Sequence, residues 1–277
     1  KSRLFVNIVL LVVVAALAAA VYWQRKDREA AAYRLSALDP ARVNSVRVEK
    51  PGQPPLVLER QGGGWRMTSP LAARAEAIQV ERLLAVLAAE SRQRLPAQDL
   101  ARFELDRPAM RLVADGQALA FGTLNPLTQE QYVLAGEWVY LVDARRAADA
   151  LAPASRYLSP RLLAEEETPE GFDFGDLSLQ QTDGRWALQP SPPAQLSQDD
   201  LNRWVQEWRL ARAQQVEPLA PASKPLSTVR LALAGGRSIS IEVLAREPET
   251  VLARRDEGLE YRFPRAVGER LLNPPRE

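Results

Sequence analysis

The stretch Gly62–Ala89, GGGWRMTSPLAARAEAIQVERLLAVLAA, contains a glycine turn, a short run with Trp and Arg, a proline and then an amphipathic helix. The same order of parts recurs in Asp183–Leu210, DGRWALQPSPPAQLSQDDLNRWVQEWRL, so that Trp65 and Trp186 stand 121 positions apart. Such a spacing indicates an internal duplication, because related segments keep their order and separation. Two further matches continue the series at offsets of 118 or 119, namely Arg111-Leu112 with Arg230-Leu231 and Val133–Ala135 with Val251–Ala253.

Each copy predicts the same elements: a meander of short antiparallel strands, an amphipathic helix, four more strands and a closing helix. In the first copy, strands are expected within 43–48, 56–59, 65–67, 110–113, 118–121, 131–134 and 138–142, with helices near 78–87 and 144–151. In the second, strands are expected at 177–181, 186–188, 229–233, 238–243, 250–254 and 260–263, with helices near 197–210 and 265–272. Nothing before Asp176 clearly matches the first strand of the first copy, so a weaker counterpart is expected there.

The N-terminal segment Leu4–Trp23 is apolar apart from Asn7, and twenty such residues match the thickness of a bilayer. Tyr22 and Trp23 end it with an interfacial aromatic pair, and the charged run 24–29 follows. We therefore expect residues 4–23 to cross the lipid bilayer. A cleaved signal peptide is the alternative, because Ala-x-Ala spacings occur within 15–20.

The resulting fold class is α+β, with one N-terminal transmembrane helix followed by two tandem repeated units of antiparallel β-meanders, each with an amphipathic helix. The expected domains are an anchor at 1–29, a first repeat unit at 30–152, a linker at 153–175 and a second repeat unit at 176–277. Long C-terminal domains are translocated largely regardless of their charge. The expected localisation is thus single-pass in the inner membrane, with the C-terminal domain in the periplasm.

Composition excludes several classes of function. The 277 residues contain neither Cys nor His, so disulfides, Cys/His metal sites, a Cys nucleophile and a His base are all absent. The formal net charge is +1, which provides no general field to hold nucleic acid. We expect no enzyme activity, no cofactor and no nucleic-acid partner.

The expected membrane helix carries candidate docking residues. Ala15 and Ala19, and likewise Ala16 and Ala20, form small-xxx-small pairs that allow close approach of another helix. Asn7 adds an amide that a partner helix can satisfy. The alternative is an ordinary alanine-rich anchor with Asn7 near the interface.

The aromatic candidates are Trp65, Trp186, Trp204 and Trp208, which either line a ligand groove or belong to the core. The acidic run Glu165–Glu167, with Asp173 and Asp176, either binds a divalent cation or is part of a solvated linker or helix end. The latter is favoured because the Asp/Asn alternation and the closing Glu of a calcium loop are missing. The run Gly62–Gly64 is interpreted as a hairpin turn, because no Lys-Ser/Thr pair follows it. Free strand edges offer a place for a partner chain to add a strand.

Several motifs together carry a family resemblance: Gly-Gly-Trp-Arg before a proline, the bend Phe103-Glu104-Leu105-Asp106-Arg107-Pro108, Leu119–Gly122, Tyr132-Val133 and Val139-Tyr140-Leu141. They resemble the bacterial family called domain of unknown function 4340. In that family the bend is commonly Phe-Gly-Leu followed closely by Pro, and here Glu104 replaces the glycine. Members are often encoded beside ABC-type export or gliding-motility transport components. The resemblance implies an accessory role in the cell envelope and supplies no catalytic residues.

Two functional hypotheses follow. The first is a non-enzymatic, membrane-tethered accessory protein of a cell-envelope or transporter complex, which docks through its repeats and its anchor helix on a membrane protein such as an ABC-type transporter component. The second is an extracytoplasmic module that binds a glycan or a lipid in a cleft between the repeats.

Overall fold

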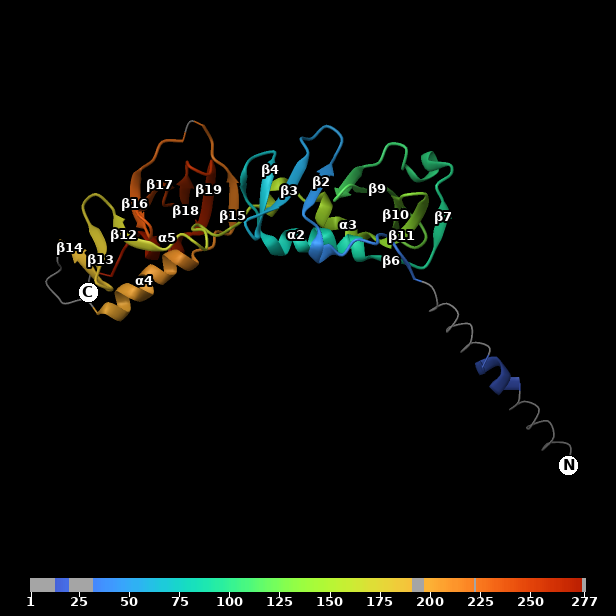
Figure 1. Cartoon of the computed structure of the whole chain (residues 1–277), viewed down its shortest axis with the longest axis horizontal. Helices are drawn as coiled ribbons and strands as arrows, with labels where there is room; N and C mark the ends of the chain where they lie inside the picture. Colours follow the sequence, from blue (N-terminus) through green and yellow to red (C-terminus); the bar gives the residue numbers. More distant parts are fainter. Residues whose placement is uncertain (1–12, 20–31, 191–196, 222, 276–277) are drawn as a thin grey trace, which may run out of the picture. The chain divides into compact units, whose positions relative to one another are not determined.

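The computed structural model describes residues 13–19, 32–190, 197–221 and 223–275 (Figure 1). Within them the regular structure is mainly β, in three sheets of two, nine and eight strands. The expected α+β class is therefore wrong. The physical reason is the short spacing of the turns: they favour strands of two to nine residues, whereas α2, α3 and α5 have only 8 residues each and α4 has 13.

The nine-stranded sheet has the order β5-β4-β3-β2-β8-β9-β10-β11-β7. Its strands are β2 (Ser45–Glu49), β3 (Leu56–Gln61), β4 (Gly64–Ser69), β5 (Ala73–Arg74), β7 (Arg94–Pro96), β8 (Met110–Ala114), β9 (Gln117–Leu124), β10 (Glu130–Ala135) and β11 (Trp138–Asp143). The two-stranded sheet pairs β1 (Tyr33–Arg34) with β6 (Glu90–Ser91). The helices of this part are η1 (Pro40–Arg42), α2 (Ala77–Leu84), η2 (Ala85–Ala88), η3 (Leu100–Phe103) and α3 (Ala144–Leu151).

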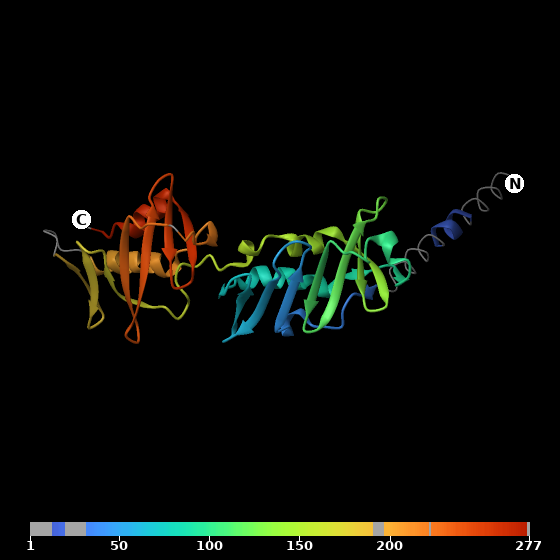
Figure 2. The same cartoon turned by 90° about the horizontal axis from the view of Figure 1, so that it is seen from above.

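The eight-stranded sheet has the order β14-β13-β12-β16-β17-β18-β19-β15. Helices α4 (Gln198–Leu210) and α5 (Arg265–Leu272) lie together against it, and α5 contacts β18 and β19 (Figures 1 and 2). A further helix, η4 (Ala154–Tyr157), precedes this sheet in the chain. The strands are β12 (Pro169–Asp173), β13 (Ser178–Thr182), β14 (Arg185–Gln189), β15 (Gln215–Pro218), β16 (Ser227–Leu233), β17 (Arg237–Ala245), β18 (Glu249–Arg254) and β19 (Leu259–Pro264).

The two large sheets have the same strand order once β5 is set aside. Strands β14, β13 and β12 correspond to β4, β3 and β2, strands β16 to β19 correspond to β8 to β11, and β15 corresponds to β7. This agreement is what an internal duplication requires. The counterpart of β2 is β12, which lies inside the segment expected to be a linker. Its sequence PEGFD lacks a run of β-branched residues, and pairing with β13 on one side and β16 on the other makes it a strand.

The expected membrane anchoring is contradicted. Among the helices of the described residues, none is long and apolar enough to cross a membrane, so single-pass localisation in the inner membrane with a periplasmic C-terminal domain is withdrawn. Of the expected span 4–23, the structure describes only 13–19, which is helical and exposed. Ala15, Ala16 and Ala19 lie in this helix, whereas Asn7 and Ala20 lie outside the described residues.

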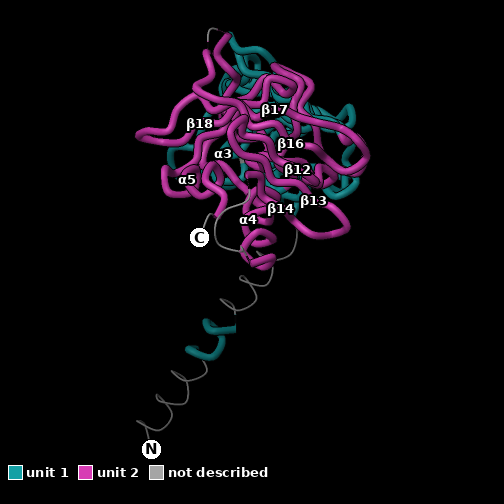
Figure 3. The backbone as a smooth tube through the Cα atoms, turned by 90° about the vertical axis from the view of Figure 1, so that its left-hand side faces the viewer, with its two compact units in different colours: residues 1–59, 78–152 teal, residues 60–77, 153–277 magenta. Residues whose placement is uncertain are grey.

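The chain divides into two compact units, which Figure 3 shows in different colours. Unit 1 comprises residues 1–59 and 78–152, and unit 2 comprises residues 60–77 and 153–277. The β4–β5 hairpin therefore belongs to unit 2, although it precedes α2 in the chain. Residues from both parts of unit 2 build the pocket described below.

The bend after η3 forces an acidic residue into an unusual backbone conformation. Glu104 has φ 56° and ψ 30°, in the left-handed region, and its N–H donates to the carbonyl of Ala101 at 3.1 Å. The flanking Phe103 and Leu105 are buried. A Cβ on Gly122 of β9 would lie 2.0 Å from the Phe103 carbonyl oxygen, so the bend is packed directly on this strand. Glycine adopts such a conformation without steric cost, which accounts for the Phe-Gly-Leu form of this bend given above as common in the family that the sequence resembles.

We predict that Glu104→Gly raises the free energy of unfolding by about 1 kcal/mol, because it removes the left-handed strain of a residue with a Cβ. Glu104→Ala is the control, since alanine keeps the Cβ and gains little. Urea unfolding followed by circular dichroism measures both variants. A loss of stability in Glu104→Gly would contradict the left-handed backbone at this bend.

Candidate binding pocket in unit 2

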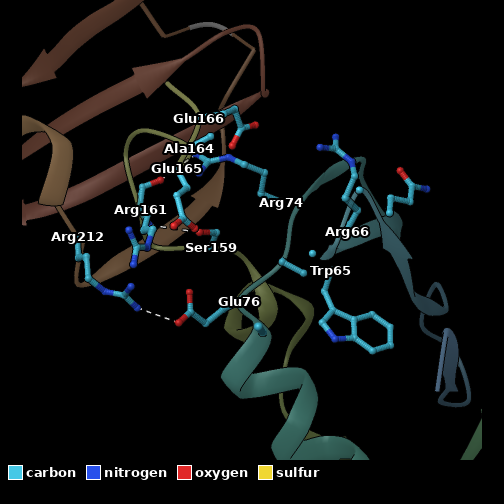
Figure 4. A pocket seen from close by; sticks show the side chains of 15 residues that line it. Trp65, Arg66, Arg74, Glu76, Ser159, Arg161, Ala164, Glu165, Glu166 and Arg212 are labelled. Carbon is cyan, nitrogen blue, oxygen red and sulfur yellow. Dashed lines mark hydrogen bonds and ion pairs between the residues drawn. The ribbon is translucent and has the colours of Figure 1, made fainter. Parts of the chain in front are cut away.

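A pocket with a volume of about 400 Å³ lies within unit 2 (Figure 4). Its walls are the β4–β5 hairpin, the start of α2, part of the connector 158–168 between η4 and β12, and Arg212 in the segment before β15. Most of the side chains that reach it are charged. They are Arg66, Arg74, Glu76, Arg161, Glu165, Glu166 and Arg212.

Backbone hydrogen bonds hold the connector in place on both sides. Residues 157–159 pair with 74–76, and residues 160–162 pair with 211–213. The connector is thereby fixed almost as firmly as a strand, although it contains no strand of its own. The bonds run from Glu76 N to Tyr157 O (2.8 Å), Ser159 N to Arg74 O (2.9 Å), Ala213 N to Pro160 O (2.8 Å) and Leu162 N to Ala211 O (3.0 Å).

This pairing also occupies the edge beyond β5. A partner strand was expected to add at free sheet edges, and here the connector of the same chain takes the place beside residues 74–76. At β14, the side-chain amide of Gln198 accepts from Trp186 N at 2.9 Å and donates to Trp186 O at 2.8 Å. The amide thus satisfies both main-chain groups of one edge residue, as a neighbouring strand would.

Two pairs of arginines face each other across the pocket strands. Arg66 lies opposite Arg74 in the β4–β5 hairpin, and Arg161 lies opposite Arg212. One member of each pair has a carboxylate partner: Arg74 Nε lies 2.7 Å from Glu257 Oε1, and Arg212 Nη2 lies 2.9 Å from Glu76 Oε1. Figure 4 shows the second of these contacts as a dashed line.

The other member of each pair has no such partner. Within the residues that the structure describes, the side chains of Arg66 and Arg161 form no ion pair. Arg66 is exposed and Arg161 is half-buried. Glu165 and Glu166 also line the pocket, are exposed and form no ion pair within the described part of the chain. The pocket therefore presents two cations and two anions to an incoming group.

Behind the pocket, a buried ion pair anchors the connector to the sheet. Arg254 of β18 is 2% exposed, and its Nη1 and Nη2 donate to both carboxylate oxygens of Glu167, at 2.6 and 2.8 Å. Arg254 Nη1 also donates to the carbonyl of Leu162 at 3.1 Å, and Glu167 Oε2 accepts from Ala164 N at 2.7 Å. Asp256 completes the set, 2.6 Å from Arg254 Nη2.

The pKa values of these groups follow from that geometry. Burial alone would lower the pKa of Arg254, but its hydrogen bonds with Glu167 and Asp256 outweigh burial and raise the pKa above its ordinary value. Burial alone would raise the pKa of Glu167, but hydrogen bonds from Arg254 and from Ala164 N–H hold it below its ordinary value. Burial alone would likewise raise the pKa of Asp256, but its hydrogen bond with Arg254 holds it below its ordinary value. Arg254, Glu167 and Asp256 therefore all stay charged at neutral pH.

Arg74 joins the pocket to this network. Its guanidinium donates to Glu257 through Nε at 2.7 Å and through Nη2 at 3.1 Å, and Nη2 also donates to the carbonyl of Arg161 at 2.8 Å. The hydroxyl of Tyr261 donates to Glu257 as well. Burial, followed by the charge of Glu257, raises the pKa of Tyr261 above its ordinary value, so the phenol remains a donor. The Arg74 side chain is thus held in position by Glu257 and by the Arg161 carbonyl.

The acidic run 165–167 does not form a cation site. Glu167 turns inward to Arg254, whereas Glu165 and Glu166 are exposed in the pocket. Among the described residues, no group of three or more His, Cys, Asp or Glu side chains could hold a metal ion. The interpretation as a solvated linker holds for Glu165 and Glu166, which are exposed, but not for Glu167, which is buried.

Three of the four tryptophans lie in one aromatic cluster. Phe172 of β12 lies 6.2, 4.8 and 5.4 Å, between ring centroids, from Trp186, Trp204 and Trp208 respectively. All three tryptophans are buried. The indole N–H groups of Trp204 and Trp208 donate to main-chain carbonyls of α5, those of Arg270 (2.8 Å) and Leu271 (2.9 Å). Their burial supports the core interpretation.

Trp65 is placed differently. It is 4% exposed in β4, is one of the residues lining the pocket, and stacks under the Arg60 guanidinium at 4.9 Å from the ring centroid. The turn before it has positive φ at Gly62 and Gly63, 58° and 85°, as the hairpin interpretation requires. Trp65 stands out in the sequence, whereas none of the pocket arginines does, because Arg is frequent throughout the chain. The register of the hairpin is needed to show that Arg66 lies opposite Arg74.

The architecture defines a mostly β protein with a duplicated antiparallel sheet and a charged pocket. The family described as Domain of unknown function (DUF4340) matches residues 65–232, more than half of the chain, from β4 to β16. This protein therefore belongs to that family, and the resemblance inferred from its turns and strands is confirmed. Comparison with curated proteins and with solved structures gives no match.

We predict that Arg254→Met lowers the free energy of unfolding by about 3–5 kcal/mol, because it leaves the buried carboxylate of Glu167 without its cation. Combining it with Glu167→Leu is expected to restore much of the loss, since an apolar pair of similar volume needs no compensation. Arg47→Met is the matched control: this strand arginine is 47% exposed and pairs with Glu49, which is 43% exposed, so we expect less than about 1 kcal/mol. Chemical denaturation measures all three variants. Equal losses at positions 254 and 47 would contradict the burial of the Arg254–Glu167 pair.

The same network predicts acid sensitivity. Glu167 and Asp256 have pKa values below their ordinary values of 4.5 and 3.8, so the unfolded chain takes up protons first as the pH falls. Their contribution to stability is complete above about pH 5 and is lost as the pH falls through the lowered values. Denaturation midpoints measured from pH 6 to pH 3 should fall more steeply in the wild type than in Arg254→Met combined with Glu167→Leu. Parallel curves would show that other carboxylates dominate acid unfolding.

Proposed function

We propose that this protein is a non-enzymatic accessory protein that binds a partner protein of a cell-envelope or transporter complex, with the pocket of unit 2 as its docking site. The observation that supports this most is the pair of arginines, Arg66 and Arg161, that lack a carboxylate within the described part of the chain. They stand on a wall held rigid by backbone pairing and by the Arg254–Glu167 ion pair. Exposed charges on a rigid wall favour binding to a complementary surface.

The alternative, binding of a glycan or a lipid, has less support. A lipid chain requires apolar walls, and the pocket is lined largely by charged side chains. A glycan commonly stacks on exposed aromatic rings, whereas Trp186, Trp204 and Trp208 are buried in the core. Catalysis has less support as well, because the sequence has no His or Cys, Glu76 and Glu257 are held in ion pairs, and only Glu165 and Glu166 remain as unpaired carboxylates among the described pocket residues.

The proposal is tested by placing a photo-crosslinking amino acid at Ala77, an exposed pocket residue in the first turn of α2, in protein at its native level in cells. We expect a discrete protein adduct, identified by mass spectrometry as a component of a transporter or envelope complex. Ala266 provides the matched control, since it is an exposed alanine in the first turn of α5 and lies outside the pocket lining. The same adduct from both positions, or none from Ala77, would refute docking at the pocket.

A further inference from the structure

The arrangement of the pocket arginines has an energetic cost. Directly opposite residues on antiparallel strands lie with Cβ atoms about 5 Å apart, and like charges there destabilise the pair. Two such pairs occur here, Arg66 with Arg74 and Arg161 with Arg212. Glu257 and Glu76 compensate only one arginine of each pair. The uncompensated arginines thus weaken the fold, as groups at binding sites often do.

An arginine that is paired only on binding selects the chemistry of its ligand. The guanidinium is a planar fork of N–H donors that matches a carboxylate with two parallel hydrogen bonds. In each pair, the neighbouring arginine is already bound to a glutamate side chain, which shows that a carboxylate fits this environment: Glu257 on Arg74 in bidentate fashion, and Glu76 on Arg212. A second carboxylate beside each would complete the pairing.

Two acidic residues at the rim of the pocket limit the kind of molecule that can present those carboxylates. Glu165 and Glu166 are exposed there, and they repel any uniformly anionic polymer or surface. The net charge of +1 provides no long-range attraction for such a polyanion. A polypeptide segment can instead place acidic side chains toward Arg66 and Arg161 and a basic side chain toward the two glutamates. A volume of about 400 Å³ accommodates a few side chains of such a segment.

We infer that the pocket recognises an acidic peptide segment of the partner protein, with one carboxylate bound by Arg66, one bound by Arg161, and a basic side chain held at Glu165 and Glu166. This inference rests on the proposed function and assigns the chemistry of its partner. The two uncompensated arginines are its specificity determinants, and Arg74 holds the main chain of one of them through the Arg161 carbonyl.

The first test is the stability of the unliganded protein. Arg66→Gln and Arg161→Gln each remove a like charge from opposite another arginine, so each is expected to raise Tm, by about 1–3 °C. Arg230→Gln is the control, because this exposed arginine of β16 lies opposite Asp173 and Ser240, and its loss is expected to leave Tm unchanged or lower it. A fall in Tm for both pocket variants would show that the two arginines are structural, and would overturn the inference.

The second test is binding to the purified full chain. The probes are a Glu-rich hexapeptide with one Lys, a Lys-rich hexapeptide and inorganic phosphate, compared at equal ionic strength. We expect the Glu-rich peptide to bind most tightly, and the double variant Arg66→Gln with Arg161→Gln to weaken it by about tenfold or more. Equal binding of the two peptides, equal binding of phosphate, or unchanged affinity in the double variant would each overturn the inference.

The crosslinking experiment separates this inference from the function on which it rests. If the adduct from Ala77 persists undiminished in the double variant, docking at the pocket stands and recognition of an acidic segment is refuted. If the adduct is lost in the double variant but retained in Arg230→Gln, both stand. An absence of any adduct from Ala77 in the wild type refutes the proposed function itself, whatever the hexapeptides do.

Discussion

The buried ion pair between Arg254 and Glu167 is the interaction on which the pocket of unit 2 depends. It holds the connector against β18, and the same guanidinium donates to the Leu162 carbonyl, which also accepts a hydrogen bond from Arg74 Nη2. A pair this deeply buried contributes little net stability, since desolvation offsets much of the attraction. Its effect is geometric: the pair holds the connector in one position, in which Ser159, Arg161 and residues 164–166 line the pocket.

The charges of the pocket divide into a fixed set and an open set. Arg74 and Arg212 are fixed by carboxylates and by the backbone pairing of their segments. Arg66 and Arg161 stand directly opposite them and lack carboxylates within the described residues. Glu257 and Glu76, the carboxylates that pair with Arg74 and Arg212, are thereby not available to Arg66 and Arg161. In the proposed function, specificity for a partner arises from these arginines, whose charge is not paired within the described part of the chain.

The two large sheets share a strand order but differ at one edge. In the first sheet β2 lies beside β8, and in the second β12 lies beside β16. The opposite edges are also equivalent, because β7 pairs with β11 and β15 pairs with β19. Among the described residues, the first copy extends beyond its β4 with β5, and that strand carries Arg74. The pocket is thus built at the edge of a duplicated scaffold whose strand order is otherwise the same.

Sequence alone determined the duplication, most strands, the helices α2 to α5 and the family, because hydrophobic alternation, turn residues and the Trp65–Trp186 spacing are local signals. It gave the wrong fold class and the wrong membrane localisation. Only tertiary structure decided that Pro169–Asp173 is a strand, since pairing on both sides overrides a weak local preference. The pocket likewise needed the tertiary fold: Arg74, the connector residues 161–167 and Arg254 are far apart in sequence, and their contacts depend on hairpin register and burial, which no local pattern encodes.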